Sequence, residues 1–371
     1  MPIHNLGYRA WPWRRTSSSF RWLAIAQNGF RIALKSNWVK RLMFFAWLPI
    51  LYWGAGIFVY ERFVEQPVGS GAINFQVNDQ PQRRPPRRRP PEFQDMLEQA
   101  RRQTGADVSE EMQSRVLADF LRSRFSFLPM SGNLSDRIAE GGRSAWRVTF
   151  WTWLLMTFFR YPQATTVVFM LGFIAPSLVA RDVRSRAFLL YFSRPIGRID
   201  YMLGKLVIPA VFLAAVTTLP ALVLYLIGLV FSPDISAVLS TWDIPLRIVL
   251  ASISLILPTA SLAVMLSSMT QESRFAAFAW FAVWALGYGA YLAVIITRAA
   301  TGRMDMGDAM NDPAVIQWAP ISLYNCLGQV QTWIFGFDSF ANTWPCLLTL
   351  GLITVVSLVL FFRNISKSVH A

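Results

Sequence analysis

Residues 181–205 read RDVRSRAFLLYFSRPIGRIDYMLGK, and this basic stretch separates two long apolar runs. Six of its residues are Arg or Lys and two are Asp. Connections with an excess of Arg and Lys stay in the cytoplasm, so the stretch sets the topology of the apolar runs on either side of it. Its ordered pattern of charges, apolar residues, Pro195 and Gly204 is unlike a plain linker and makes it the best indicator of function.

The composition is that of a membrane protein. Hydrophobic residues make up 54% of the 371 residues and charged ones 15%, which is too apolar for an ordinary soluble domain. The net charge of +14 would also suit nucleic acid. Because the basic residues flank the apolar runs, we expect membrane lipid as a partner and no nucleic acid. His4 and His370 stand at opposite ends of the chain, so the sequence predicts no metal site.

Six apolar runs approach or exceed the roughly 20 residues that cross a hydrocarbon core of about 30 Å. We therefore predict an all-α membrane protein, a bundle of six transmembrane helices. The predicted spans are residues 42–60, 161–180, 206–231, 248–269, 275–297 and 343–362. No ionisable side chain lies inside them, which disfavours an ion-coupled carrier.

The charges around these runs orient the bundle. Residues 1–41 hold eight Arg or Lys and no acid, and the tail at 363–371 adds Arg363 and Lys367. With six spans, both segments lie on the same side as the 181–205 stretch, which the positive-inside rule identifies as the cytoplasm. Both termini are therefore predicted to be cytoplasmic. The mostly acidic connections at 232–246 and 298–342 are predicted to be external.

Two segments next to the spans are predicted to lie at the membrane surface. Residues 17–40, within the N-terminal segment 1–41, have the pattern of a basic amphipathic helix in the headgroup layer. The alternative is a solvated basic tail. Residues 314–337, within the external connection 298–342, are apolar but interrupted by Pro320, and we expect a re-entrant or interfacial hairpin there.

Residues 61–160 are predicted to form a partly helical external insert between the first two spans. It begins with a Pro/Arg-rich linker at 65–91, continues with a helix at 92–127 and ends with a Trp-rich interfacial helix at 145–159. An apolar stripe on the middle helix is expected to pack on the membrane domain or on a second copy. The stripe comprises Met112, Val116, Leu117, Phe120 and Leu121.

The sequence shows no catalytic motif. Residues 197–205, GRIDYMLGK, end in Gly-Lys, but they lack the glycine spacing and the following Ser or Thr of a phosphate-binding loop. We therefore expect a protein that is not an enzyme and holds no cofactor. Cys326 and Cys346 are predicted near the external face, either joined in a disulfide or as two buried free thiols.

The stretch 181–205 has the features of a docking element. A short charged segment with apolar anchors suits a groove on another protein, and the alternative is a lipid anchor without a protein partner. The candidate contact residues are Arg181, Asp182, Arg184, Arg186, Leu190, Tyr191, Arg194, Pro195, Arg198, Gly204 and Lys205.

At these residues the chain resembles the membrane permeases of the type-2 export family of ATP-binding cassette (ABC) transporters. In that family an acid follows the second span, and leucines and a proline lead to a Leu-Gly-Lys at the third. The matching positions here are Asp182, Leu189, Leu190, Ser193, Arg194, Pro195, Arg198, Leu203, Gly204 and Lys205. Arg186 and Ala187 stand about where the family often has Gly-Thr.

The resemblance implies a permease subunit in the cytoplasmic (inner) membrane of a bacterium. Two copies of a separate ABC ATPase subunit would bind ATP and Mg and dock on residues 181–205. A second permease subunit, identical or related, would complete an exporter. The alternative function is a non-transport scaffold, or an ATP-driven mechanical relay that acts through the external insert.

Overall fold

The computed structural model describes residues 21–62, 131–185, 187, 196–232 and 236–370, together with separate helical residues between positions 96 and 120. The described residues contain helices and no strand. Six helices are long and apolar enough to cross a membrane. The predicted all-α bundle of six transmembrane helices is confirmed.

The N-terminal segment forms an amphipathic helix followed by the first span. Helix α1 (Arg21–Leu34) ends before Ser36, so the helix predicted over residues 17–40 is divided, and residues 1–20 lie outside the described part. The first span consists of α2 (Asn37–Trp47) and α3 (Pro49–Tyr60). The division falls at Pro49, which lacks the N–H that would continue the hydrogen bonding of α2.

The second span is one continuous helical run from Ala145 to Arg184. It comprises α6 (Ser131–Phe158), the π-helical turn η3 (Phe159–Gln163), α7 (Ala164–Ile174) and α8 (Pro176–Arg184). Residues 145–159 are therefore not a separate interfacial helix. Their Trp and Phe side chains are buried against α3 and against α11 of the third span, so they belong to the protein interior.

The remaining spans surround a central helix. The third span is α10 (Arg198–Val216) with α11 (Thr218–Phe231), and the fourth is α13 (Ile244–Ser268). The fifth is α14 (Ser273–Gly302) and the sixth is α18 (Phe340–His370). Helix α13 packs against all the others named here and against α8. Small buried residues such as Ala260, Ala263 and Ser267 permit these close approaches.

The connections between the third and fourth spans and between the fifth and sixth spans contain short helices. Helix α12 (Ser236–Ser240) precedes α13, while α15 (Met306–Asn311), α16 (Pro313–Ile316), η4 (Ala319–Ile321) and α17 (Leu323–Ile334) lie between α14 and α18. Helix α17 has 12 residues, is too short to span, and packs against α13, α14 and α18. It occupies the predicted position of the re-entrant segment.

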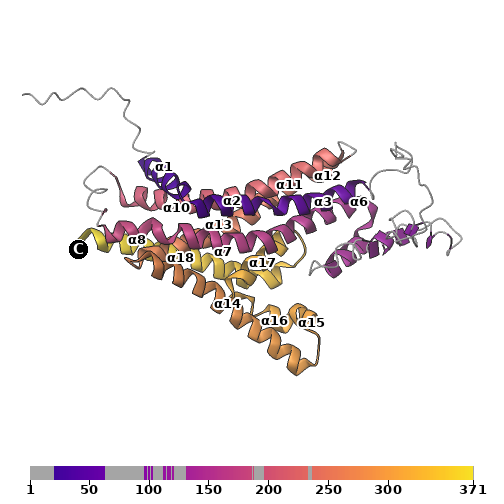
Figure 1. Ribbon diagram of the computed structural model, residues 1–371. Helices are drawn as coiled ribbons and strands as arrows, with labels where there is room; N and C mark the ends of the chain where they lie inside the picture. Colours follow the sequence, from indigo (N-terminus) through magenta and orange to yellow (C-terminus); the bar gives the residue numbers. More distant parts are fainter. Residues whose placement is uncertain are drawn as a thin grey trace, which may run out of the picture.

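The helices begin and end at two opposite ends of the bundle (Figure 1). Helix α1, the end of α8, the start of α10 and the C-terminus gather at one end, which we call the basic end. Helices α12 and α15 lie at the opposite end. Near that opposite end, a Trp-rich core includes Trp151 and Trp153 and also contacts the insert, because Leu117 and Phe120 are buried in it and Val116 packs against it.

Candidate functional site

A buried ion pair joins the second and third spans at the basic end. The Lys205 Nζ on α10 lies 2.8 Å from the Asp182 Oδ2 on α8 and donates to the Leu178 carbonyl oxygen at 2.6 Å. The Tyr201 hydroxyl also donates to Asp182 Oδ2, at 2.7 Å. The Lys205 and Asp182 side chains are only 8% and 15% exposed. We call Asp182, Tyr201 and Lys205 the brace.

The local sequence places the brace. Gly197 has extended backbone, and its N–H donates to the Asp200 carboxylate at 3.0 Å, which fixes the first turn of α10. Tyr201 and Lys205 then follow one turn apart, so both side chains face α8. Gly204 lies on α10 where this helix contacts α1, and an added Cβ there would come within 2.9 Å of the Trp22 carbonyl oxygen.

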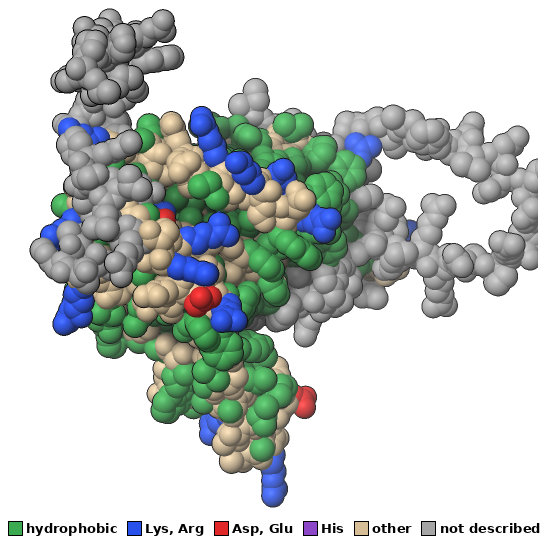
Figure 2. All heavy atoms as spheres, turned by 60° about the vertical axis from the view of Figure 1, so that its left-hand side comes forward, with side chains coloured by type: hydrophobic (Ala, Val, Ile, Leu, Met, Phe, Trp, Pro, Cys, Tyr) green, Lys and Arg blue, Asp and Glu red, His purple; other side chains and the backbone are tan. Residues whose placement is uncertain are grey.

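Exposed charges surround the brace. Arg184 on α8 and Arg274 on α14 each lie 3.7 Å from Glu272, which stands in the turn between α13 and α14. Arg181 is also exposed; its carbonyl oxygen accepts from the Ser185 hydroxyl at 2.8 Å, and its side chain has no hydrogen bond or ion pair with any residue that the structure describes. We call Arg181, Arg184, Glu272 and Arg274 the rim. Figure 2, which looks onto this end, shows many Lys and Arg side chains and few acidic ones.

The comparisons with known proteins identify the family of this chain. A family model described as ABC-2 family transporter protein matches residues 23–365, which is nearly the whole chain. The chain belongs to the ABC-2 transporter family. Neither the curated proteins nor the solved structures contain a match. The predicted resemblance is confirmed, and this ABC-2 family protein is an integral membrane transporter permease.

The predicted contact residues of this ABC-2 protein lie in different surroundings. Arg181 and Arg184 are exposed, whereas Asp182, Gly204 and Lys205 lie in the interior contacts described above. Arg198 donates to the Ser366 hydroxyl of α18 at 3.3 Å and so ties the third span to the sixth. Five other candidates lie outside the described residues: Arg186, Leu190, Tyr191, Arg194 and Pro195.

Sequence reasoning missed two parts of the site. Glu272 and Arg274 were not singled out, although the charged run QESR between two apolar spans was a readable signal. Arg160 was also missed. It lies inside the second span, so the expectation that the spans hold no interior ionisable side chain is wrong. A lack of charge within the spans therefore does not disfavour an ion-coupled carrier.

Arg160 lies on the π-helical turn and contacts α17. Its guanidinium donates to Asn325 Oδ1 at 3.3 Å and lies 5.4 Å from the centre of the Tyr324 ring. The Tyr324 hydroxyl also donates to the Arg160 carbonyl oxygen at 3.1 Å. The turn and Arg160 together attach α17 to the second span.

We expect Gly328→Ala to detach Arg160 from α17. An added Cβ at Gly328 would overlap Nη1 and Cζ of Arg160, so the guanidinium would have to leave Asn325. The free energy of unfolding should fall by about 1–3 kcal/mol, because the guanidinium would lose its hydrogen bond to Asn325. The measurement is an SDS unfolding titration in mixed micelles.

Gly351→Ala is the matched control, because nothing lies within 4 Å of an added Cβ there. Arg160→Met combined with Gly328→Ala should cost less than the sum of the single changes, since the overlap is then relieved. Equal effects of Gly328→Ala and Gly351→Ala would contradict the assignment.

The two cysteines are buried free thiols, the second of the two sequence alternatives. The Cys326 Sγ on α17 donates to the Cys346 carbonyl oxygen on α18 at 3.4 Å. This contact links α17 to the sixth span without a covalent bond. The alternative of a disulfide between Cys326 and Cys346 is not found in the structure.

Proposed function

We propose that this permease is the membrane subunit of an ATP-driven exporter and that separate ATPase subunits dock at the basic end. The brace is the observation that carries the proposal. It fixes the two spans that flank the connection at residues 185–197, so a force applied to that connection reaches both spans together. The predicted ATPase contacts lie within or beside this connection.

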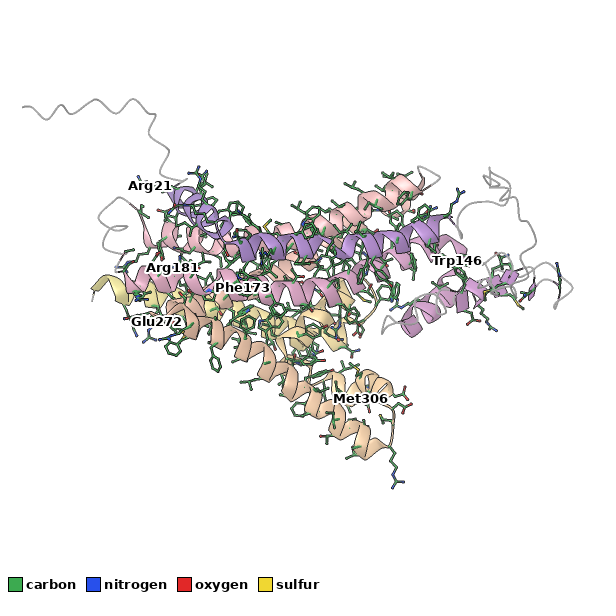
Figure 3. The ribbon with its side chains drawn as sticks, viewed as in Figure 1. Arg21, Trp146, Phe173, Arg181, Glu272 and Met306 are labelled. Carbon is green, nitrogen blue, oxygen red and sulfur yellow. The ribbon has the colours of Figure 1, made fainter. Side chains whose placement is uncertain are left out.

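In this proposal the rim is the surface on which the ATPase docks. Arg181 and Arg184 project from the end of α8, and exposed charges of one sign steer a partner of the opposite sign. Figure 3 shows Arg181 and Glu272 together at the end of the bundle, although Arg181 lies on α8 and Glu272 in the turn before α14. We infer an ATPase groove with acidic side chains, with ATP and Mg bound in the ATPase subunits.

The same proposal includes the assembly and the orientation. The basic end would face the cytoplasm by the positive-inside rule, in a bacterial inner membrane with both termini inside. Two ATPase copies would serve two permease subunits. The apolar outer faces of α14 and α18 include exposed Phe278, Leu286 and Leu352, and they would contact lipid or the second permease subunit.

The docking test is Arg184→Glu in the permease co-expressed with its ATPase. We expect the amount of ATPase that co-purifies to fall about tenfold, because a repulsive charge replaces an attractive one at the contact. Arg303→Glu, an exposed arginine at the opposite end, is the control. Retention of the ATPase at the wild-type amount, with the variant inserted in the membrane, would refute docking at the rim.

One observation favours a second function, that of a mechanical relay. The insert residues Leu117 and Phe120 are buried in the Trp-rich core, so movement of the spans would reach the insert. Reconstitution with the ATPase separates the two functions. Movement of cargo across the vesicle membrane supports the exporter, whereas ATP turnover that moves the insert without cargo supports the relay.

A further inference from the structure

A cleft at the basic end combines apolar walls with a charged mouth. Its volume is about 440 Å³, within the usual range for small-molecule sites. Helices α1 and α2 form one wall, and α7, α8 and α14 form the other. The apolar lining includes Ile32, Phe173, Leu178 and Ala277, and the mouth carries Arg181 and Arg274.

The charge at the mouth is positive. Lys205 and Asp182 also line the cleft, but they form an ion pair and neutralise each other. Arg181 and Arg274 remain, and a second hollow of about 450 Å³ beside the mouth adds Arg184. Arg184 and Arg274 each lie 3.7 Å from a single acid, Glu272, and the Arg181 side chain has no ion pair with the described residues. Such exposed pairs are weak, so the guanidinium groups can bind another anion.

The position of the cleft fits a molecule of the bilayer. The mouth lies at the helix ends of the basic end, while Phe173 lies further along α7 (Figure 3). The Phe173 ring stacks on Trp38 of α2 at 5.9 Å, with the planes 2° apart, where the two walls meet. Helix α1, with Ile25 and Gly29 buried and Arg31 exposed, has the character of a helix in the headgroup layer.

We propose that this cleft binds one anionic phospholipid, with its phosphate on Arg181 and Arg274 and an acyl chain along Ile32, Phe173 and Ala277. A planar guanidinium binds phosphate oxygens in pairs, which gives the headgroup a defined position. The apolar walls exclude a soluble anion as the preferred ligand, because they would stay unoccupied. The bound lipid joins α1 to α8 beside the brace.

The test measures retained lipid and does not depend on ATPase docking. The full-length protein is purified in detergent with phosphatidylglycerol or phosphatidylcholine, and bound lipid is counted by native mass spectrometry. We expect one phosphatidylglycerol to remain bound and phosphatidylcholine to be lost. Arg274→Gln combined with Arg181→Gln should weaken phosphatidylglycerol binding about tenfold. Arg363→Gln, an exposed arginine elsewhere at the basic end, should leave the binding unchanged.

A second pair of variants tests the apolar part of the site. Ala277→Trp fills the cleft and should displace the lipid, whereas Ala285→Trp on the exposed side of the same helix should not. Three results would overturn the proposal: equal retention of both lipids, displacement of the lipid by soluble glycerol phosphate, or retained binding in Ala277→Trp. The proposal would also be overturned if a segment of the ATPase or of a second permease copy occupied the cleft in place of lipid.

Discussion

Replacing Lys205 with methionine is expected to lower the free energy of unfolding by about 3–5 kcal/mol. The Asp182 carboxylate would lose the ammonium group that lies 2.8 Å away, and it is largely shielded from water. The Tyr201 hydroxyl and the Leu178 carbonyl cannot replace that charge. An SDS titration in mixed micelles measures the change, and stimulation of the partner ATPase should be lost with it.

Two variants give this prediction its controls. Lys367→Met removes an exposed lysine at the same end and should change stability by no more than about 0.5 kcal/mol. Asp182→Leu with Lys205→Met removes both charges and should recover most of the stability. If Lys205→Met unfolds at the same SDS fraction as Lys367→Met, the ion pair does not stabilise the spans. A stable double variant that still activates the ATPase would show that the charges are dispensable for coupling.

Trp151→Ala is expected to destabilise the protein by a similar amount, about 3–5 kcal/mol. The Trp151 side chain is 1% exposed and belongs to the Trp-rich core. Its ring fills the space beside Gly228, where an added Cβ would come within 2.7 Å of it, and its Nε1 donates to Glu61 Oε1 at 3.1 Å. Removal leaves a large cavity and takes a donor from the buried Glu61 carboxylate.

Trp242→Ala provides the comparison, because Trp242 is exposed before the start of α13. Thermal unfolding of both variants in the same lipid nanodiscs measures the difference. Glu61 also keeps the Arg147 guanidinium at 3.2 Å, so the variant should remain inserted and folded at low temperature. Equal melting temperatures for the two alanine variants would show that the Trp-rich core does not control the stability of this end.

The sequence predicted the six spans because each is a long uncharged apolar run. It did not predict that residues 145–159 are interior. Trp-rich composition is shared by interfacial helices and by buried ones, and only the packing against α3 and α11 distinguishes them. Arg160 was missed for the same reason, since it separated two segments that were taken as distinct.

The candidate site was predictable only in part. Asp182 and Lys205 were both identified from the pattern around the connection, but as contacts for a partner. Their ion pair depends on how α8 lies beside α10, which no local pattern encodes. The rim residues Arg184 and Arg274 both lie 3.7 Å from Glu272 because α8 packs against α14, and these two helices are distant in sequence.

The continuous helical run from Ala145 to Arg184 transmits movement along its length as well as forming a span. Its 40 residues extend over about 60 Å, roughly twice the thickness of the hydrocarbon core. A tilt of about 5° about the basic end would displace the far end by about 5 Å over that length. The stiffness of the joint at Pro162 then determines how much of a movement at the basic end reaches the opposite end of the bundle.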